Sequence, residues 1–242
     1  MFLRRLVGAL ACAVLAGDML ALQRGAPAGQ TAMLLQRLQG TVEYSAAADG
    51  TAVEVVGTQQ IAADQYAITL VQSMAALKLP DSSVVSIGES TRVRAGEFLS
   101  AAAGPGSTIA IEGGSLHFAI KHPAGGQANY TFVTPTSTIA VRGTEGLIES
   151  QERYDSIAVI DGKENDVTVT AKDGQTYAVA PKTTLRLQRT PRGTIRPFVL
   201  AGIRSPAFRQ FRPIVLANAR ARAQARQHAK GQPASKQGEK KH

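Results

Sequence analysis

One stretch decides the fold class of this chain: Ile157-Ala158-Val159-Ile160-Asp161-Gly162, followed by Val167-Thr168-Val169 and then by Asp173-Gly174. Short runs rich in β-branched residues are separated by Asp-Gly pairs, which are typical of tight turns between antiparallel strands. The apolar-polar alternation of Val167-Thr168-Val169 indicates a strand with one buried face. The stretch therefore predicts β-hairpins whose turns place Gly162 and Gly174 at positive φ.

The same pattern extends over most of the chain, from Gln39 to about Pro197. Short apolar runs alternate with Gly, Asp-Gly or Pro at intervals of roughly 8 to 12 residues, which is the signature of an all-β domain. We expect a single all-β domain over residues 38–197, with about a dozen short strands. It should form a β-solenoid-like or rolled sheet, and no fixed repeat period decides between a sandwich, a barrel and a solenoid.

The composition excludes several functions. The 242 residues include no tryptophan and 5% aromatic residues, which argues against an aromatic-lined groove for sugars or nucleotides. Cys12 is the only cysteine, so the mature domain has no disulfide, no cysteine zinc site and no thiol nucleophile. We therefore expect neither redox chemistry nor a cofactor.

The N-terminus resembles a secretory signal peptide of the bacterial type. Arg4 and Arg5 precede an apolar run, residues 6–17, that is too short to cross a bilayer, which takes about 20 residues. We expect a signal peptide within residues 1–28, with cleavage near Ala16, Ala21 or Ala28. An N-terminal amphipathic or buried helix is the alternative. Export predicts a periplasmic or extracellular protein. Association with the cell envelope is compatible with either location.

The C-terminal segment, residues 204–242, carries the excess positive charge. It holds ten of the 27 Lys and Arg residues but one of the 18 Asp and Glu residues. We expect a separate basic tail, helical over about 214–230 and then disordered. The tail is either a solubilising extension or a contact for an anionic envelope polymer or lipid head groups. Export and the lack of interleaved aromatic residues disfavour nucleic acid as its partner. The candidate contact residues are Arg204, Arg209, Arg212, Arg220, Arg222, Arg226 and Lys230.

No catalytic constellation stands out in the sequence. The domain has two histidines, His117 and His122, and no nucleophile elbow, HExxH motif or phosphate-binding loop. His117 falls in a strand pattern, where a packed or half-exposed side chain is expected. Glu145, Glu149 and Glu152 are expected to share a solvated strand edge. The sequence thus predicts no enzyme and no metal site, and disfavours an exported hydrolase.

An ordered series of motifs carries the most specific signal. The pieces are Ala75 to Gly88 with Leu77-Lys78-Leu79-Pro80-Asp81-Ser82-Ser83, then Glu112 to Leu116, Phe132-Val133-Thr134-Pro135, Val141-Arg142-Gly143-Thr144, Ile157 to Gly162 and Val167-Thr168-Val169. In this order they resemble the FecR domain family over about residues 38–190. The resemblance implies an extracytoplasmic all-β domain that contacts another protein.

Two departures from the family pattern are visible. Ser82 stands where the family usually has glycine, which puts the local turn geometry in question. Family members that regulate sigma factors also carry a cytoplasmic helical domain and a membrane span, and neither is expected here. We therefore predict a non-enzymatic interaction or sensing module whose partner is an unidentified envelope protein, with envelope polyanion binding through the tail as the alternative function.

We expect the residues of the family motif either to have a structural role or to contact the partner. They are Asp81, Ser82, Val141, Arg142, Gly143 and Thr144. For Arg142 we favour a structural role, in which the guanidinium staples the turn by bonding carbonyls or a carboxylate. Contact with a ligand is the alternative.

Overall fold

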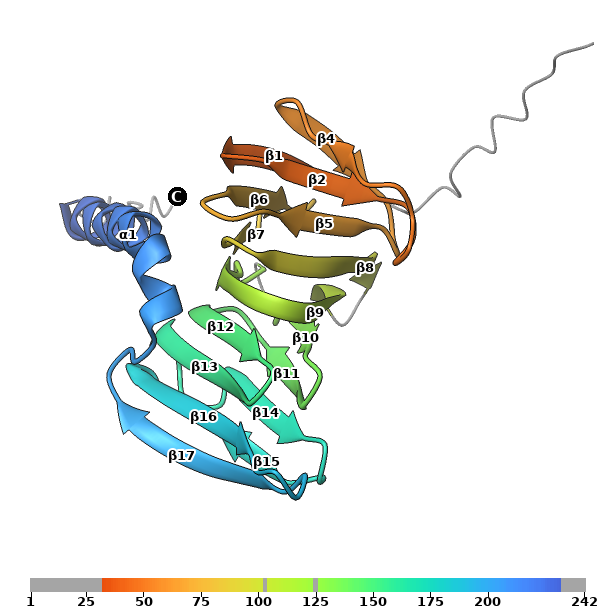
Figure 1. Ribbon diagram of the computed structural model, residues 1–242. Coiled ribbons are helices and arrows are strands. Elements are labelled where there is room, and N and C mark those ends of the chain that lie inside the picture. The colour runs from red at the N-terminus through yellow and green to blue at the C-terminus, as the bar shows by residue number, and fades with distance from the viewer. Residues whose placement is uncertain (1–31, 102–103, 124–125, 232–242) are drawn as a thin grey trace, which may run out of the picture.

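A computed structural model describes residues 32–101, 104–123 and 126–231. The expected signal peptide and the expected disordered C-terminal end lie outside the described residues. All 17 strands belong to one hydrogen-bonded network (Figure 1). The strands are β1 Met33–Gln39, β2 Val42–Ser45, β3 Val53–Glu54, β4 Thr58–Ile61, β5 Tyr66–Thr69, β6 Met74–Lys78, β7 Val84–Ile87, β8 Thr91–Ala101, β9 Gly104–Ala119, β10 Asn129–Val133, β11 Ser137–Val141, β12 Glu145–Gln151, β13 Tyr154–Asp161, β14 Val167–Ala171, β15 Thr176–Ala178, β16 Thr183–Arg189 and β17 Ile195–Ala201.

The network rolls into two layers, as the all-β prediction of a rolled sheet requires. Layer A has the order β4-β1-β6-β7-β9-β12-β13-β16-β17. Layer B has the order β3-β2-β5-β8-β9-β10-β11-β14-β15, in which β9 and β10 are parallel and the other pairs antiparallel. The chain passes repeatedly from one layer to the other, so turns between the layers collect at the ends of the strands.

Strand β9 belongs to both layers. Its first half pairs with β8 and β10 in layer B, and its second half pairs with β7 and β12 in layer A. The change occurs at Gly113-Gly114, where β9 continues from one layer into the other. Gly114 has φ +105°, and a Cβ there would lie 2.2 Å from Thr91 Oγ1. Glycine therefore lets the strand bend and continue.

One hydrophobic core fills the space between the layers. Phe118 in the layer A half of β9 stacks on Phe132 of β10 in layer B, with ring centroids 5.2 Å apart. Both rings are fully buried, together with side chains such as Leu77, Ile109 and Ile139. Burying aliphatic and aromatic side chains of this size contributes about 1.5–3 kcal/mol each, so this core is the main stabilising feature.

The structure differs from the sequence prediction in two local respects. The described residues form 17 strands where about a dozen are predicted, and β4 and β8 are examples that contain few consecutive apolar residues. Of the two turn glycines Gly162 and Gly174, only Gly174 has positive φ, at +86°. In the β13–β14 connection the left-handed residue is Asn165, with φ +67°. Asparagine tolerates this conformation better than most residues because its short polar side chain bonds locally.

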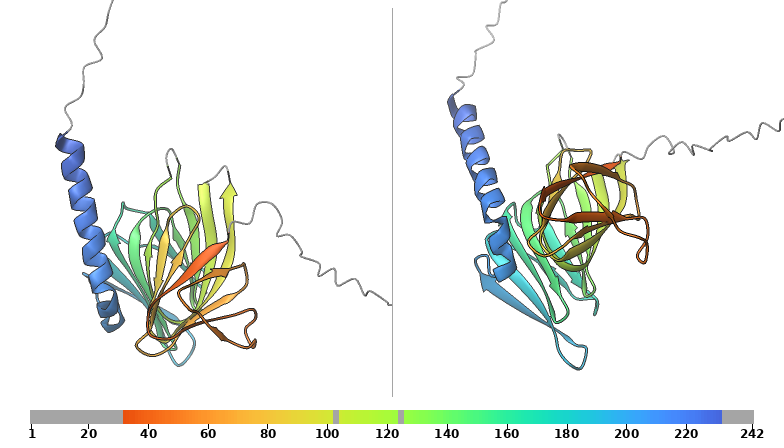
Figure 2. Two further views of the ribbon diagram at one scale, coloured as in Figure 1. Left: turned by 90° about the horizontal axis from the view of Figure 1, so that it is seen from above. Right: turned by 45° about the horizontal axis from the view of Figure 1, so that its top comes forward.

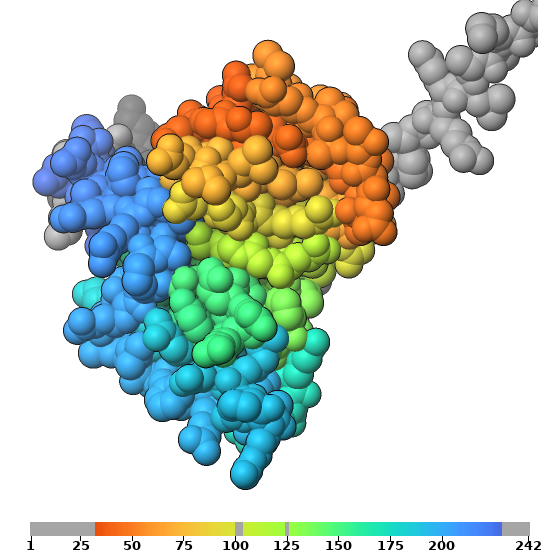
Figure 3. Space-filling model, in the orientation of Figure 1, coloured from red at the N-terminus to blue at the C-terminus, as the bar shows by residue number. Residues whose placement is uncertain are grey.

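The basic segment begins as part of the folded domain. A 3₁₀ helix, η1, spans Pro206–Phe211 and leads into α1, Arg212–Gly231, which covers the range in which the sequence predicts a helix. The two elements lie on the outer face of layer A, in blue in Figures 1 and 3. Phe208 and Phe211 of η1 are buried there against Leu147 and Ala158. Within the part of the chain that the structure describes, no helix has the length and apolarity to cross a membrane.

Candidate interaction site

The motif piece Val141-Arg142-Gly143-Thr144 forms the turn that leads from β11 in layer B to β12 in layer A. Val141 ends β11 in the core, and Gly143 has φ +109°. A Cβ on Gly143 would lie 2.6 Å from Nδ1 of His122, so only glycine fits without a shift. The Thr144 hydroxyl donates to the Asp161 carbonyl oxygen. A Cβ on Gly162 would lie 2.0 Å from that hydroxyl, so Gly162 provides close approach and not a positive φ.

Arg142 contributes to this turn through its backbone. Its backbone N–H donates to the Asp166 carbonyl oxygen at 2.9 Å, but its side chain is exposed. Among the residues that the structure describes, none bonds the Arg142 guanidinium. The described residues therefore give no support to a stapling guanidinium, and contact of Arg142 with a ligand stays the alternative prediction.

The motif piece that contains Asp81-Ser82-Ser83 forms the turn between β6 and β7. The Asp81 carboxylate accepts hydrogen bonds from the Ser83 backbone N–H and hydroxyl, both at 2.9 Å, and from the Tyr130 hydroxyl at 2.8 Å. Burial, and then the hydrogen bond and charge of Asp81, raise the pKa of Tyr130 well above its ordinary value. Ser82 has φ +66°, a region that glycine occupies without strain, so the structure explains the glycine of the family pattern.

The two motif turns meet at one groove of about 490 Å³. Ser82 comes from the first turn and Gly143 and Thr144 come from the second, although about 60 residues separate them in the sequence. Lys121 and His122 line the same groove, and its other wall is α1. The family motif and the basic segment, which the sequence treats as separate features, thus build one site.

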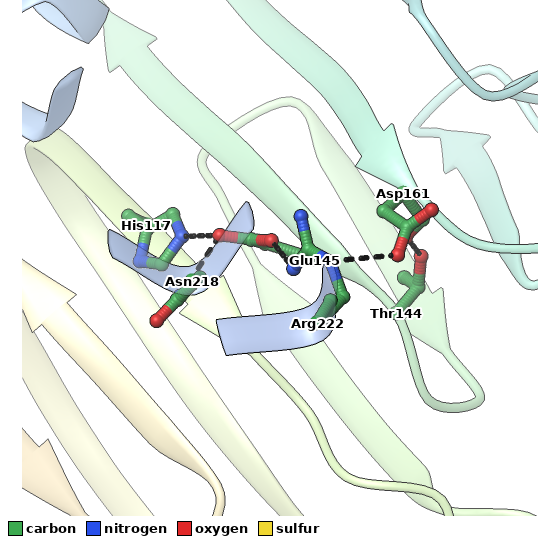
Figure 4. Close-up of polar contacts among 6 residues, drawn as sticks. All are labelled: His117, Thr144, Glu145, Asp161, Asn218 and Arg222. Carbon is green, nitrogen blue, oxygen red and sulfur yellow. Dashed lines mark hydrogen bonds and ion pairs between the residues drawn. The ribbon is translucent and has the colours of Figure 1, made fainter. Parts of the chain in front are cut away.

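A buried carboxylate connects the groove to α1 (Figure 4). Glu145, at the start of β12, is 4% exposed, and its Oε1 lies 2.8 Å from Nε2 of His117 on β9. Asn218 Nδ2 donates to the same oxygen at 2.9 Å, and Arg222 Nη1 bonds the other oxygen. Arg222 Nε also lies 3.1 Å from Oδ2 of Asp161, at the end of β13. Three strands, β9, β12 and β13, and the helix α1 therefore share a single polar network.

The protonation chemistry of this network is set by burial and hydrogen bonding. Burial alone raises the pKa of Glu145, but hydrogen bonds from His117, Asn218 and Arg222 outweigh it and lower this pKa below its ordinary value. Because a carboxylate only accepts, Nε2 of His117 carries the proton of their hydrogen bond. The other ring nitrogen of His117 is buried without a partner among the described residues, and the ring stacks on Phe211 at 6.1 Å.

The lowered pKa predicts how α1 docking responds to acid. Glu145 contributes its full stabilisation above the ordinary pKa of 4.5 and loses it as the pH falls from there through the lower folded-state pKa. We expect the helical circular dichroism signal to fall in this pH range, because the neutral acid no longer holds Arg222. In Glu145→Gln the signal should be weaker at neutral pH and lack this step. An identical acid transition in both proteins would assign it to other carboxyl groups.

The expected solvated edge of three glutamates is wrong for two of them. Glu145 and Glu149 are each 4% exposed, whereas Glu152 is exposed. Glu149 accepts hydrogen bonds from the Tyr154 hydroxyl, at 3.0 Å, and from the Ser205 hydroxyl. The reason is that β12 is a central strand of layer A and η1 and α1 cover its outer face. The aromatic pair Phe208 and Phe211 is the sequence signal that could have indicated this cover.

The candidate polyanion contacts differ in their surroundings. Arg222 is held by Glu145 and Asp161, so it is part of the domain's own structure. The side chain of Lys230 is not described. The other five are exposed, namely Arg204, Arg209, Arg212, Arg220 and Arg226. No cluster of His, Cys, Asp and Glu side chains that suits a metal ion occurs in residues 32–101, 104–123 and 126–231.

The fold and the site define a two-layer β domain with a C-terminal helix held over its motif turns. Residues 64–165 match the model of the FecR protein family, which confirms the family resemblance and makes this part of the chain a FecR domain.

A candidate anti-sigma factor from Parabacteroides distasonis ATCC 8503, solved at 1.65 Å and 2.50 Å, is 16% identical, with TM-scores of 0.47 and 0.45. The similarity covers 57% of this chain and spans 60% of the length of that protein. No curated protein matches the chain.

Proposed function

We propose that this chain is an exported, non-catalytic regulatory or sensing module that binds an envelope protein at the groove between its motif turns and α1. One observation carries the proposal: Ser82, Gly143 and Thr144 line the same groove as Arg222 of α1. Export is supported by Arg4, Arg5 and the apolar run that follows them.

The groove has the mixed character of a protein contact surface. Apolar Ala119, Ile120 and Ile214 lie beside Lys121 and His122, which are exposed cations or potential cations at its rim. The two carboxylates of the groove, Glu145 and Asp161, are both paired with Arg222. A carboxylate committed to an arginine is a poor general base, which favours binding over catalysis.

A site-specific photo-crosslinker tests the proposal in intact cells. Placed at Lys121, at the rim of the groove, it is expected to give one discrete crosslinked envelope protein. The matched control position is Lys172, which is also exposed but follows β14 in layer B and does not line the groove. The same product from both positions, or no discrete product from position 121, would contradict the proposal.

Polyanion binding is the second candidate function, and one observation favours it. Residues 204–231 contain no Asp or Glu, and five of their arginines are exposed. Each exposed Lys or Arg near an anionic surface contributes about 1 kcal/mol, so the five suffice for reversible attachment at low salt.

The same cells distinguish the two functions. Removing the whole segment is unsuitable, because it would also remove Phe208 and Phe211 from layer A. The charge-reversal variant Arg220→Glu/Arg226→Glu leaves the buried contacts in place. Loss of envelope association in this variant, with unchanged crosslinking at position 121, is the result expected if the segment also binds polyanions.

A further inference from the structure

The C-terminal segment contacts layer A as a helical ligand would. Phe208, Phe211, Ile214, Asn218 and Arg222 follow one another at intervals of three or four residues, so they lie on one face. The two phenylalanines are buried, and Ile214 packs beside them. Apolar anchors followed by polar groups on one helical face are the usual composition of a helix bound in a groove.

The receiving surface is built by strands alone. His117 and Leu147 are directly opposite each other on β9 and β12, and Leu147 is opposite Ala158 on β13. Glu145 and Asp161 are also paired in the β12–β13 register. These positions are set by backbone hydrogen bonds within layer A, so the surface does not need α1 in order to exist.

Few side-chain contacts attach α1 to layer A, although the helix is long. In the described chain its side-chain hydrogen bonds to layer A come from Asn218 and Arg222. The helix has 20 residues, or about 30 Å, and its residues from Ala223 to His228 are exposed. Figure 2 shows that this end of α1 extends beyond the strands. A helix held at one end and on one face can be displaced without disturbing the core.

We propose that α1 is an exchangeable occupant of this surface, and that the partner of the proposed function replaces it with an amphipathic helix presenting an arginine to Glu145 and Asp161. The inference rests on the proposed function and deepens it. Charge complementarity selects the occupant, because two carboxylates on adjacent strands pair bidentately with a guanidinium and less well with an ammonium group. Access of the partner is then controlled by the undocking of α1.

Binding of a labelled synthetic peptide of residues 204–231 to the full chain tests this exchange. In the variant Phe211→Ala/Arg222→Ala the chain's own helix loses an apolar contact and its ion pairs with layer A. The peptide is expected to bind this variant at least about tenfold more tightly than it binds the unmodified chain. The reason is that the tethered helix otherwise competes at an effective concentration of about millimolar. Adding Glu145→Gln to this variant should abolish the gain.

Matched controls keep the result interpretable. Leu216→Ala/Arg220→Ala removes the same charge from the exposed face of α1 and should leave peptide binding unchanged. If the Phe211 variant does not fold, Arg222→Ala alone should show a smaller gain of the same sign. A folded variant that binds the peptide no better than the unmodified chain, or equally well after Glu145→Gln, overturns the inference.

The crosslinking experiment separates this inference from the proposed function. Excess peptide is expected to reduce the product formed from position 121. A discrete product that the peptide does not reduce overturns the helix exchange but leaves the binding module intact. Peptide binding without any crosslinked envelope protein overturns the proposed function and leaves an exchangeable α1 whose occupant is the chain itself.

Discussion

Asp155→Ala is expected to lower the free energy of unfolding by at least about 3 kcal/mol, because hydrogen bonds to a buried charged group contribute about 1.5–3 kcal/mol each. Asp155 is 0% exposed and accepts hydrogen bonds from four hydroxyl groups. Those of Thr134, Ser137 and Ser150 lie 2.5, 3.1 and 2.8 Å from its oxygens, and Thr136 supplies the fourth. Removing the carboxylate leaves all four without their common acceptor.

Chemical denaturation measures this effect. Asp155→Asn retains the shape and one acceptor oxygen, so its loss should be smaller than that of the alanine variant. Glu152 is an exposed carboxylate in the turn of the same β12–β13 hairpin, and Glu152→Ala should change the stability by less than about 0.5 kcal/mol. A loss below about 1 kcal/mol in Asp155→Ala would show that the hydroxyl groups find other partners.

Phe211→Ala is expected to release α1 while the β domain stays folded. Truncating a buried phenylalanine typically costs about 3–5 kcal/mol, and the ring of Phe211 is 0% exposed between Leu147 and His117. Since η1 connects α1 to layer A, this loss falls on the docking of the helix. Hydrogen exchange should show loss of protection in residues 212–222 and retained protection in β6, β7 and β9.

The control for this prediction is Leu216→Ala. Leu216 lies on the same helix but is 46% exposed, so its truncation should leave exchange in α1 and in the strands unchanged. Uniform loss of protection in Phe211→Ala across both layers would mean that α1 and the core unfold together. That outcome would also remove the basis for an exchangeable helix.

The fold was predictable where local chemistry repeats along the chain. Short β-branched runs and turn residues sufficed for an all-β domain, because a strand pattern is set by neighbours two residues apart. The order of the motifs also predicted the turns at Ser82 and Gly143. Which glycine takes a positive φ was less predictable, because Gly162 serves close approach to Thr144 while Asn165 takes the left-handed conformation.

The site was less predictable because it depends on contacts between distant segments. Glu145 and Arg222 are 77 residues apart, and nothing local to either indicates that they pair. The count of charged residues in 204–242 places Arg222 in a solvated tail, although two buried phenylalanines anchor its helix to layer A. A buried carboxylate within a β pattern and an aromatic pair within a basic segment become informative only when they are considered together.

The long strand β9 has a consequence for how the chain matures. It provides the last strand for the N-terminal half of each layer and the first strand for the C-terminal half. During synthesis, an N-terminal half that has closed on β9 presents open backbone edges until β10 and β12 arrive, and open edges invite pairing between chains. The two halves therefore cannot mature as independent units, and a chain interrupted after β9 should aggregate rather than accumulate as a smaller soluble domain.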